Sequence, residues 1–190
     1  FLAADPARCA AWGAWLVSSA AMQPVAIRSQ HHGEYAAGAI QRVAPSRGAG
    51  KRRVALSATG GTWATGRSKR TIPFDLISDL IELNPQVTFV CLEYEDRKEE
   101  LEGFPQVLNP DWATKKGADL DDLAALVSNL DLVISATNST VDLCGALGVP
   151  TWALVPESPP WRYSDATAPA GDDSMWFYES VRTFRQKPGQ

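Results

Sequence analysis

The chain has 190 residues, 45% of them hydrophobic, which is enough for one domain with a buried core. Its formal net charge of -4 gives no general attraction to nucleic acid or to an anionic membrane, so any site for an anion has to be local. The three cysteines (Cys9, Cys91 and Cys144) are far apart, which indicates reduced thiols rather than disulfides or a metal site. Because no apolar run reaches the about 18 residues of a membrane span, we expect a soluble, cytoplasmic protein.

The first predicted element is a short helix within residues 4 to 16, ADPARCAAWGAWL. Asp5 is a suitable N-cap and Pro6 occupies the first helical position. The two tryptophans of this helix are expected to pack on the rest of the chain. Residues 17 to 53 lack hydrophobic periodicity and are typical of a loose insert or linker.

Strands and helices alternate after this segment. The apolar strand RVALSATGG is followed by the basic loop TGRSKRTIP and the amphipathic helix FDLISDLIEL. VTFVCLEY and QVLN are the next predicted strands, separated by the charged helix or turn EDRKEELEGF. A helix in DLDDLAALVSNL then precedes the strand DLVISA, a helix ending at Gly148, and the strand TWALVP. This order predicts an α/β fold with a doubly wound, Rossmann-like parallel sheet.

The tail, SMWFYESVRTFRQ, has a pattern of its own. Phe177, Val181 and Phe184 fall at i, i+4 and i+7, which predicts a helix with one apolar stripe and Trp176 at its edge. An exposed stripe of this kind tends to find another surface, so we expect self-association through the tail helix or its contact with a missing N-terminal domain. The alternative is a helix docked entirely on its own sheet.

Four small polar residues stand between a predicted buried strand and the next helix: Thr137, Asn138, Ser139 and Thr140. Ligands of open α/β sheets bind beyond the carboxyl ends of the strands, where the N–H groups of a helix N-terminus can hold a phosphate. The alternative is a purely structural cap by Asn138 or Ser139, with Ser139 and Asp142 as a capping box. The local sequence leaves both interpretations open.

A second candidate for phosphate binding is the glycine turn after the first strand of the domain. Gly60 and Gly61 permit close approach of the backbone to a ligand. Arg67, Lys69 and Arg70 follow, and their side chains could donate charge-assisted hydrogen bonds to a diphosphate. A basic surface loop is the alternative interpretation of this run.

DLVISATNSTVDLCGALGVPTWALVP, the following PPWRY and the tail SMWFYESVRTFRQ resemble the C-terminal region of glycosyltransferases similar to the ADP-heptose transferases. The resemblance is to the bacterial versions fused to tetratricopeptide repeats. ADPARCAAWGAWL, RSKRTIPF and DLDDLAALVSNLDLVIS fit the same family in the same order, so the resemblance extends over most of the chain apart from about residues 17 to 50. It implies one half of a GT-B architecture, the C-terminal half of two facing Rossmann-like domains.

The resemblance also implies roles for individual residues. It places Asn138, Ser139 and Thr140 near the donor diphosphate and Arg70 close to the cleft, which is lined by the two glycines of the turn. Glu93 stands where the family commonly has Gln, and it either faces the nucleoside or ends a strand.

Two residues depart from the family pattern Asp-Asn/Thr-x-x-x-His. Thr137 replaces the acid, and Asp142 replaces the histidine, which reverses the local charge. A carboxylate about 5 Å from a phosphate, at an effective dielectric constant near 20, disfavours binding by about 3 kcal/mol. Either the basic loop compensates, or Asp142 turns away as a cap, or the site has lost its donor.

The resemblance implies that residues 54–163 form a nucleotide-sugar-binding domain, preceded by a helix and linker (1–53) and followed by a tail helix (164–190). This domain would belong to an inverting glycosyltransferase that transfers a sugar from a nucleotide-diphosphate sugar to a protein or glycan acceptor. The catalytic base is expected from a missing N-terminal domain. Helix N-terminus and basic side chains can stabilise the leaving diphosphate, so no metal or other cofactor is expected. His31 and His32 have no partners at ligand spacing and are interpreted as loop residues.

Two alternatives remain. The chain could be a non-catalytic nucleotide-binding or protein-interaction module that kept the fold and lost the chemistry, as Thr137 and Asp142 indicate. It could also be a doubly wound domain of another nucleotide-using enzyme, although a single Gly-Gly without G-x-G-x-x-G speaks against an ordinary dinucleotide fold. Neither nucleic acid nor a membrane span is expected as a partner.

Overall fold

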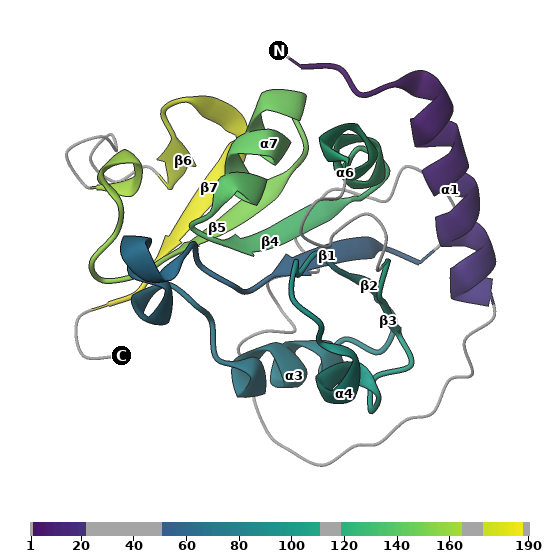
Figure 1. Ribbon diagram of the computed structural model, residues 1–190, viewed down its shortest axis with the longest axis horizontal. Coiled ribbons are helices and arrows are strands. Elements are labelled where there is room, and N and C mark those ends of the chain that lie inside the picture. The colour runs from purple at the N-terminus through teal and green to yellow at the C-terminus, as the bar shows by residue number, and fades with distance from the viewer. Residues whose placement is uncertain (1, 22–50, 111–118, 165–172, 188–190) are drawn as a thin grey trace.

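The computed structural model describes residues 2–21, 51–110, 119–164 and 173–187. Its strands are β1 (Arg53–Ser57), β2 (Thr88–Cys91), β3 (Val107–Leu108), β4 (Leu132–Ala136), β5 (Thr151–Val155), β6 (Ser174–Met175) and β7 (Tyr178–Arg185). They form one sheet in the order β3-β2-β1-β4-β5-β7-β6 (Figure 1). All neighbouring strands pair in parallel except β6, which is antiparallel to β7. The predicted doubly wound α/β fold is therefore confirmed.

Helices cover both faces of this sheet. They are α1 (Pro6–Ala21), α3 (Phe74–Glu82), α4 (Lys98–Leu101), α6 (Leu120–Val127) and α7 (Ser139–Leu147). In Figure 1, α6 and α7 lie on one side of the sheet and α3 and α4 on the other. Each face has its own apolar core, because the strands are apolar on both sides. Within the described ranges, none of the helices has the length and apolar character needed to cross a bilayer.

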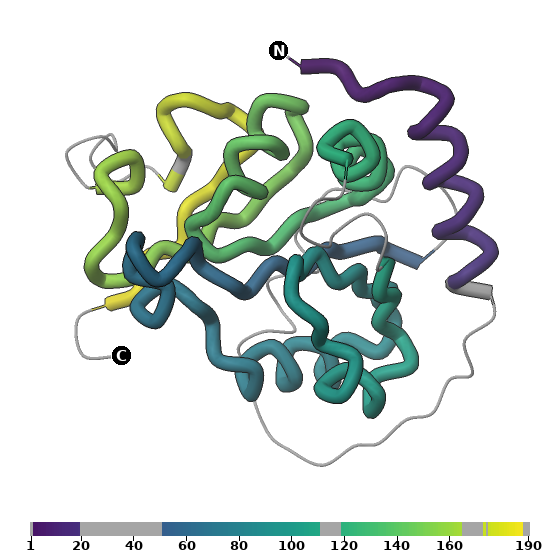
Figure 2. Tube along the Cα trace, viewed as in Figure 1, coloured from purple at the N-terminus to yellow at the C-terminus, as the bar shows by residue number. Residues whose placement is uncertain are grey.

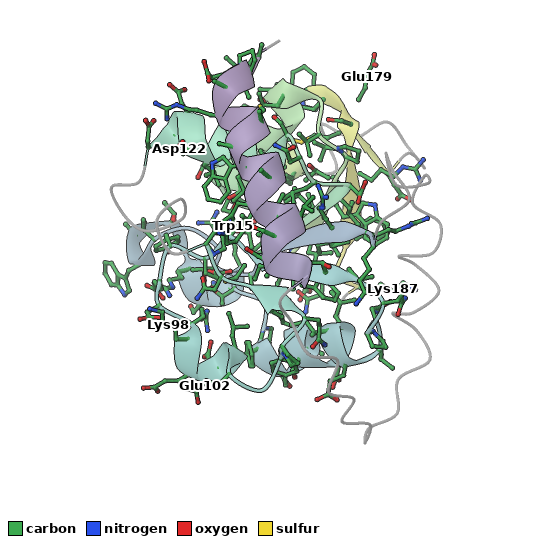
Figure 3. All side chains as sticks on the ribbon, turned by 90° about the vertical axis from the view of Figure 1, so that its right-hand side faces the viewer. Trp15, Lys98, Glu102, Asp122, Glu179 and Lys187 are labelled. Atoms are coloured by element: carbon green, nitrogen blue, oxygen red, sulfur yellow. The ribbon has the colours of Figure 1, made fainter. Side chains whose placement is uncertain are left out.

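Helix α1 packs beside α6 and belongs to the same core. The Asp5 carboxylate accepts the N–H of Arg8 at 2.8 Å, so the predicted N-cap is confirmed. Trp12 is buried and meets Trp15 edge-to-face, with ring centroids 5.2 Å apart. The Arg8 guanidinium lies 3.2 Å from Asp122 at the start of α6, and Figure 3 shows this side of the molecule with Trp15 and Asp122 labelled. The tryptophans therefore pack on the rest of the chain, as the sequence predicts.

The order of the strands fixes where a ligand can bind. From β1 the chain proceeds to β2 and β3 on one side, whereas from β4 it proceeds to β5 and β7 on the other. Loops after β1 and β4 therefore separate toward opposite faces and leave a crevice at the carboxyl ends of these two strands. All polar residues singled out in the sequence after β1 and β4 lie at this edge.

The tail is a strand, so the prediction of a tail helix within residues 164–190 is wrong. Val181 and Thr183 are buried while Arg182 between them is exposed, which is the period of two of a β-strand. Both buried residues are β-branched and favour a strand. Because residues 181–185 of β7 pair with β5, the tail is part of the main sheet, and the tail helix expected to make the contact is not formed.

Candidate functional site

A pocket of about 700 Å³ opens at the carboxyl ends of β1 and β4. Its walls are the loop after β1, the start of α7, Tyr94 after β2 and residues 158–163 after β5. Figure 2 shows the blue chain after β1 beside the light-green chain after β5, although these segments are far apart in the sequence. The pocket therefore lies at the point where the strand order reverses.

Asn138 holds the two central strand ends together. Its Oδ1 accepts the N–H of Thr140 at 2.9 Å, which caps α7, and also the hydroxyl of Ser135 at 3.1 Å. Its Nδ2 donates to Ser57 Oγ and to the Thr59 carbonyl, both at 2.9 Å. With two donated and two accepted hydrogen bonds, the amide is fully satisfied by the protein. Of the two interpretations, capping is thus confirmed for Asn138.

Arg70 lies across the crevice beneath the glycine turn. Its Nη1 donates to the Thr137 carbonyl at 2.9 Å and its Nη2 to Thr65 Oγ1 at 2.6 Å. Gly61 has φ 71° and sits against the guanidinium, so a side chain there would be strained and would collide with Arg70. Gly60 packs on the Arg70 backbone and does not line the pocket. The glycine turn is thus required for packing of this arginine.

Glu93 lies under the same loop rather than in the pocket wall. Its side chain is buried, and Oε1 accepts the N–H groups of Ala58 and Thr59, the latter at 3.0 Å. The other carboxylate oxygen, Oε2, is buried without a partner within the described ranges. The structure thus places Glu93 at a strand end, where it positions the backbone that leads into the glycine turn.

The three predicted basic residues have different surroundings. Arg67 makes a bidentate ion pair with Glu95, with 2.6 Å between Nη1 and Oε1, and does not line the pocket. This hydrogen-bonded pair lowers the pKa of Glu95. Lys69 and Arg70 line the pocket, and the Lys69 ammonium has no partner in the described part of the chain.

The start of α7 presents hydroxyls to the pocket. Ser139 and Thr140 both line it, and their side-chain oxygens make no hydrogen bond with any residue that the structure describes. Together with the positive end of α7, these hydroxyls can bind a phosphate by donating hydrogen bonds to it, because the first N–H groups of a helix are directed out of its N-terminus. Their role in donor binding remains a prediction.

Asp142 brings a negative charge into this wall, and that charge is paired. Its Oδ2 lies 3.2 Å from Nη2 of Arg162, which follows β5. Burial raises the pKa of Asp142, and the Arg162 charge opposes that change. The compensating cation therefore comes from the PPWRY segment and not from the basic loop. The pocket wall carries three cationic side chains against this one carboxylate (Lys69, Arg70 and Arg162 against Asp142).

Several residues of the pocket wall were not predicted as site residues, among them the polar side chains of Tyr94, Arg162 and Tyr163. Tyr163 is 2% exposed, burial raises the pKa of its phenol, and its hydroxyl has no partner within the described ranges. The Thr137 hydroxyl, at the end of β4, is buried and unpartnered in the same sense. The position of PPWRY directly after the strand TWALVP was the available signal, because that strand ends at the same edge of the sheet.

No metal centre is visible in the part of the chain that the structure describes. No group of three or more His, Cys, Asp or Glu side chains lies close enough there to hold an ion. His31 and His32 lie outside the described residues.

The chain was compared with known protein families, sequences and structures, and the similarities concern its fold. No family model matches the chain. It is 35% identical to Protein FlbA of Caulobacter vibrioides over 122 residues, which are 62% of this chain and 19% of that protein, so the match spans about a fifth of the relative. Its structure is similar to E. coli heptosyltransferase WaaC with ADP, at a TM-score of 0.50 and 18% identity over 84% of this chain and 43% of that one. The same enzyme with ADP-2-deoxy-2-fluoro heptose gives a TM-score of 0.50 and 20% identity over 84% and 44%.

The chain therefore has the Rossmann-like fold of one half of a GT-B glycosyltransferase. This agrees with the fold that the sequence resemblance implies. At these identities the structural likeness concerns the fold, and the chemistry of the site has to be argued from its own residues.

Proposed function

We propose that the chain is the donor-binding domain of a glycosyltransferase, the C-terminal half that binds a nucleotide-diphosphate sugar. The observation that carries this proposal is the convergence, at one pocket between β1 and β4, of the start of α7, the cation Lys69, and the hydroxyls of Ser139 and Thr140, which have no partner among the described residues. Such a site fits the two phosphates of a donor. The fold of heptosyltransferase WaaC, solved with ADP, supports the same assignment.

The pocket would serve the reaction by stabilising the leaving diphosphate. Its negative charge develops as the sugar is transferred, and a fixed helix N-terminus with cationic side chains favours that charge without a metal. The one carboxylate in the described pocket wall, Asp142, already forms an ion pair with Arg162 within this domain. We therefore assign the catalytic base to a second Rossmann-like domain of the parent protein. The acceptor is a protein or glycan, and the sequence resemblance is to transferases that are fused to tetratricopeptide repeats.

Calorimetry with ADP, UDP and GDP tests the donor site. At least one diphosphate should bind, and replacing both hydroxyls (Ser139→Ala with Thr140→Ala) should weaken it by about tenfold, because two hydrogen bonds to a charged group are lost. Ser78→Ala on α3 removes a helix hydroxyl away from the pocket and serves as the matched control. Equal affinity of the double variant and the wild type would remove this site from consideration.

A non-catalytic nucleotide-binding module is the second candidate, and the Asp142–Arg162 pair favours it because it reduces the net positive charge available to phosphates. The two candidates differ in whether the sugar nucleotide is consumed after it binds. The complete parent protein should cleave the sugar nucleotide that this domain binds if it is a transferase. Tight binding without hydrolysis or transfer by the complete protein would favour the module.

A further inference from the structure

The two sides of the pocket, toward β2 and toward β5 from the start of α7, differ in how their hydroxyls are hydrogen-bonded. On the side of β2, the hydroxyls of the pocket wall bind one another or the backbone: Tyr94 donates to the Gly61 carbonyl at 3.2 Å, and Thr62 and Thr65 are 3.2 Å apart, oxygen to oxygen. The groups left without a partner there, among the described residues, are the cationic Arg70 Nε and the Lys69 ammonium. On the side of β5, two hydroxyls of the pocket wall have no partner among the described residues. They belong to Thr137 and Tyr163, each 2% exposed.

Unpartnered hydroxyls in a pocket wall indicate a ligand. Burying a hydroxyl without a hydrogen bond is unfavourable, and most buried polar groups in proteins are therefore paired. Thr137 directly follows β4, Tyr163 lies in the 3₁₀ turn Trp161–Tyr163 after β5, and both line the same cavity. A polar ligand group at this end of the pocket would satisfy both.

The order of nucleoside, diphosphate and sugar in the donor indicates which of these parts contacts the Thr137 and Tyr163 hydroxyls. In Rossmann-like sheets the pyrophosphate lies at a helix N-terminus, and the ribose is bound by an acidic residue about 20 positions after the first βα turn, which places the nucleoside toward β2. With the diphosphate at the start of α7, the sugar is the part of the donor that reaches the β5 side. Its hydroxyls both donate and accept, which matches an acceptor in Asp142 and donors in Tyr163 and Arg162.

We propose that Thr137, Asp142, Arg162 and Tyr163 form the subsite for the sugar, and that the Tyr163 hydroxyl is a specificity-determining hydrogen-bond donor to it. Trp161, 67% exposed at the rim, adds an apolar ring face beside this subsite. The proposal rests on the proposed function, because it needs the nucleotide to be bound at α7. It goes further by dividing the pocket into a nucleoside side and a sugar side.

Tyr163→Phe tests the division in the whole chain. Affinities are measured by calorimetry for ADP, UDP and GDP and for ADP-glucose, UDP-N-acetylglucosamine and GDP-mannose, and the pair that binds the wild type most tightly is used. The variant should bind the sugar nucleotide about tenfold more weakly and the free diphosphate within about twofold of the wild type. Its melting temperature should not fall, because the lost hydroxyl has no partner in the described structure.

Two controls separate this result from a general disturbance. Tyr178→Phe makes the same change on β7, outside the pocket wall, and should alter neither affinity. Tyr94→Phe acts on the nucleoside side and should change both affinities by the same factor. A Tyr163→Phe variant that weakens both ligands equally, or neither, overturns the sugar subsite and leaves the proposed function intact. Failure of all six compounds to bind the wild type overturns the proposed function and the subsite with it.

Discussion

Asn138 and Ser139 are neighbours at the start of α7, yet their side chains have opposite hydrogen-bonding roles. Asn138 makes four hydrogen bonds within the protein and holds β1 against the start of α7. Ser139 is exposed at the pocket and makes none within the described ranges. Glu93 resembles Asn138 in that its Oε1 accepts two backbone N–H groups, although its Oε2 has no partner within the described ranges. Tyr163 resembles Ser139 in that its hydroxyl has no partner among the described residues.

We call Asn138 and Glu93, which bind the backbone around the pocket, the frame, and we call Ser139 and Tyr163, whose hydroxyls are available to a ligand, the binding surface. A polar side chain whose bonds are all made inside the protein fixes the position of a loop but has nothing left for a ligand. A polar side chain that lacks hydrogen-bond partners within the protein slightly lowers the stability of the ligand-free protein and is available to bind a ligand. Substitutions in the frame should therefore change the free energy of unfolding, and substitutions in the binding surface should change affinity.

The largest expected effect is that of Asn138→Ala. It removes the cap of α7, worth about 1 kcal/mol, and leaves two partners at the end of β1 without their bonds, at about 1 kcal/mol each. Unfolding in urea should show a loss of about 3 kcal/mol. Ser139→Ala next to it should cost less than about 0.5 kcal/mol. Similar small losses in both variants would contradict the division into frame and surface.

Glu93→Ala should have the next largest effect. The N–H groups of Ala58 and Thr59 lose their common acceptor, and burial without a partner should lower the free energy of unfolding by about 2 kcal/mol. Glu93→Gln keeps an acceptor oxygen and should lose about half as much. Urea unfolding of the three proteins at equal pH gives the comparison. A glutamine variant as unstable as the alanine variant would mean that the carboxylate charge, rather than the acceptor, holds the loop.

Much of the frame could be predicted from the sequence, because it depends on local patterns. Continuous apolar runs gave the strands, and Asn138 stood between a strand and a helix, where N-caps occur. The tail was mistaken because Phe177, Val181 and Phe184 also fit the period of a helix. The residues that the strand buries, Val181 and Thr183, become distinguishable only when pairing with β5 is known.

The binding surface was harder to predict, because its charges pair over long distances in the sequence. Arg67 and Arg70 are three residues apart, but Arg67 pairs with Glu95 and Arg70 reaches the end of β4. Asp142 finds Arg162 twenty residues away. No local pattern distinguishes these arginines, since short 3₁₀ turns (Trp63–Thr65 and Arg67–Lys69) set their directions.

Asp142→Asn acts on the binding surface and should change affinity by a smaller amount. Removing a half-exposed carboxylate near the phosphates and releasing Arg162 should tighten diphosphate binding by about fivefold, or about 1 kcal/mol, at low salt. Because burial raises the pKa of Asp142, acidification toward that pKa neutralises the wild type, and the ratio of the two affinities should approach one. The sugar subsite adds a second expectation, that the variant gains less for the sugar nucleotide than for the diphosphate. Weaker diphosphate binding by the variant would instead make Asp142 a ligand or a cap.

Glu95→Gln should have the smallest effect, because the Arg67–Glu95 pair is on the surface and outside the pocket wall. The hydrogen bond from Arg67 lowers the pKa of Glu95, so its contribution to stability is present above the ordinary glutamate value near 4.5 and is lost as pH falls through the lowered pKa. The variant should be slightly less stable than the wild type at pH 7 and equally stable in acid or in high salt, as urea unfolding can measure. Glu99→Gln, which removes an exposed glutamate without a partner in the described structure, should show no such pH dependence. The affinity for a diphosphate decides whether Arg67 takes part in donor binding. Release of Arg67 in Glu95→Gln should leave this affinity unchanged, and a clearly higher affinity would return Arg67 to the donor site that the sequence predicted.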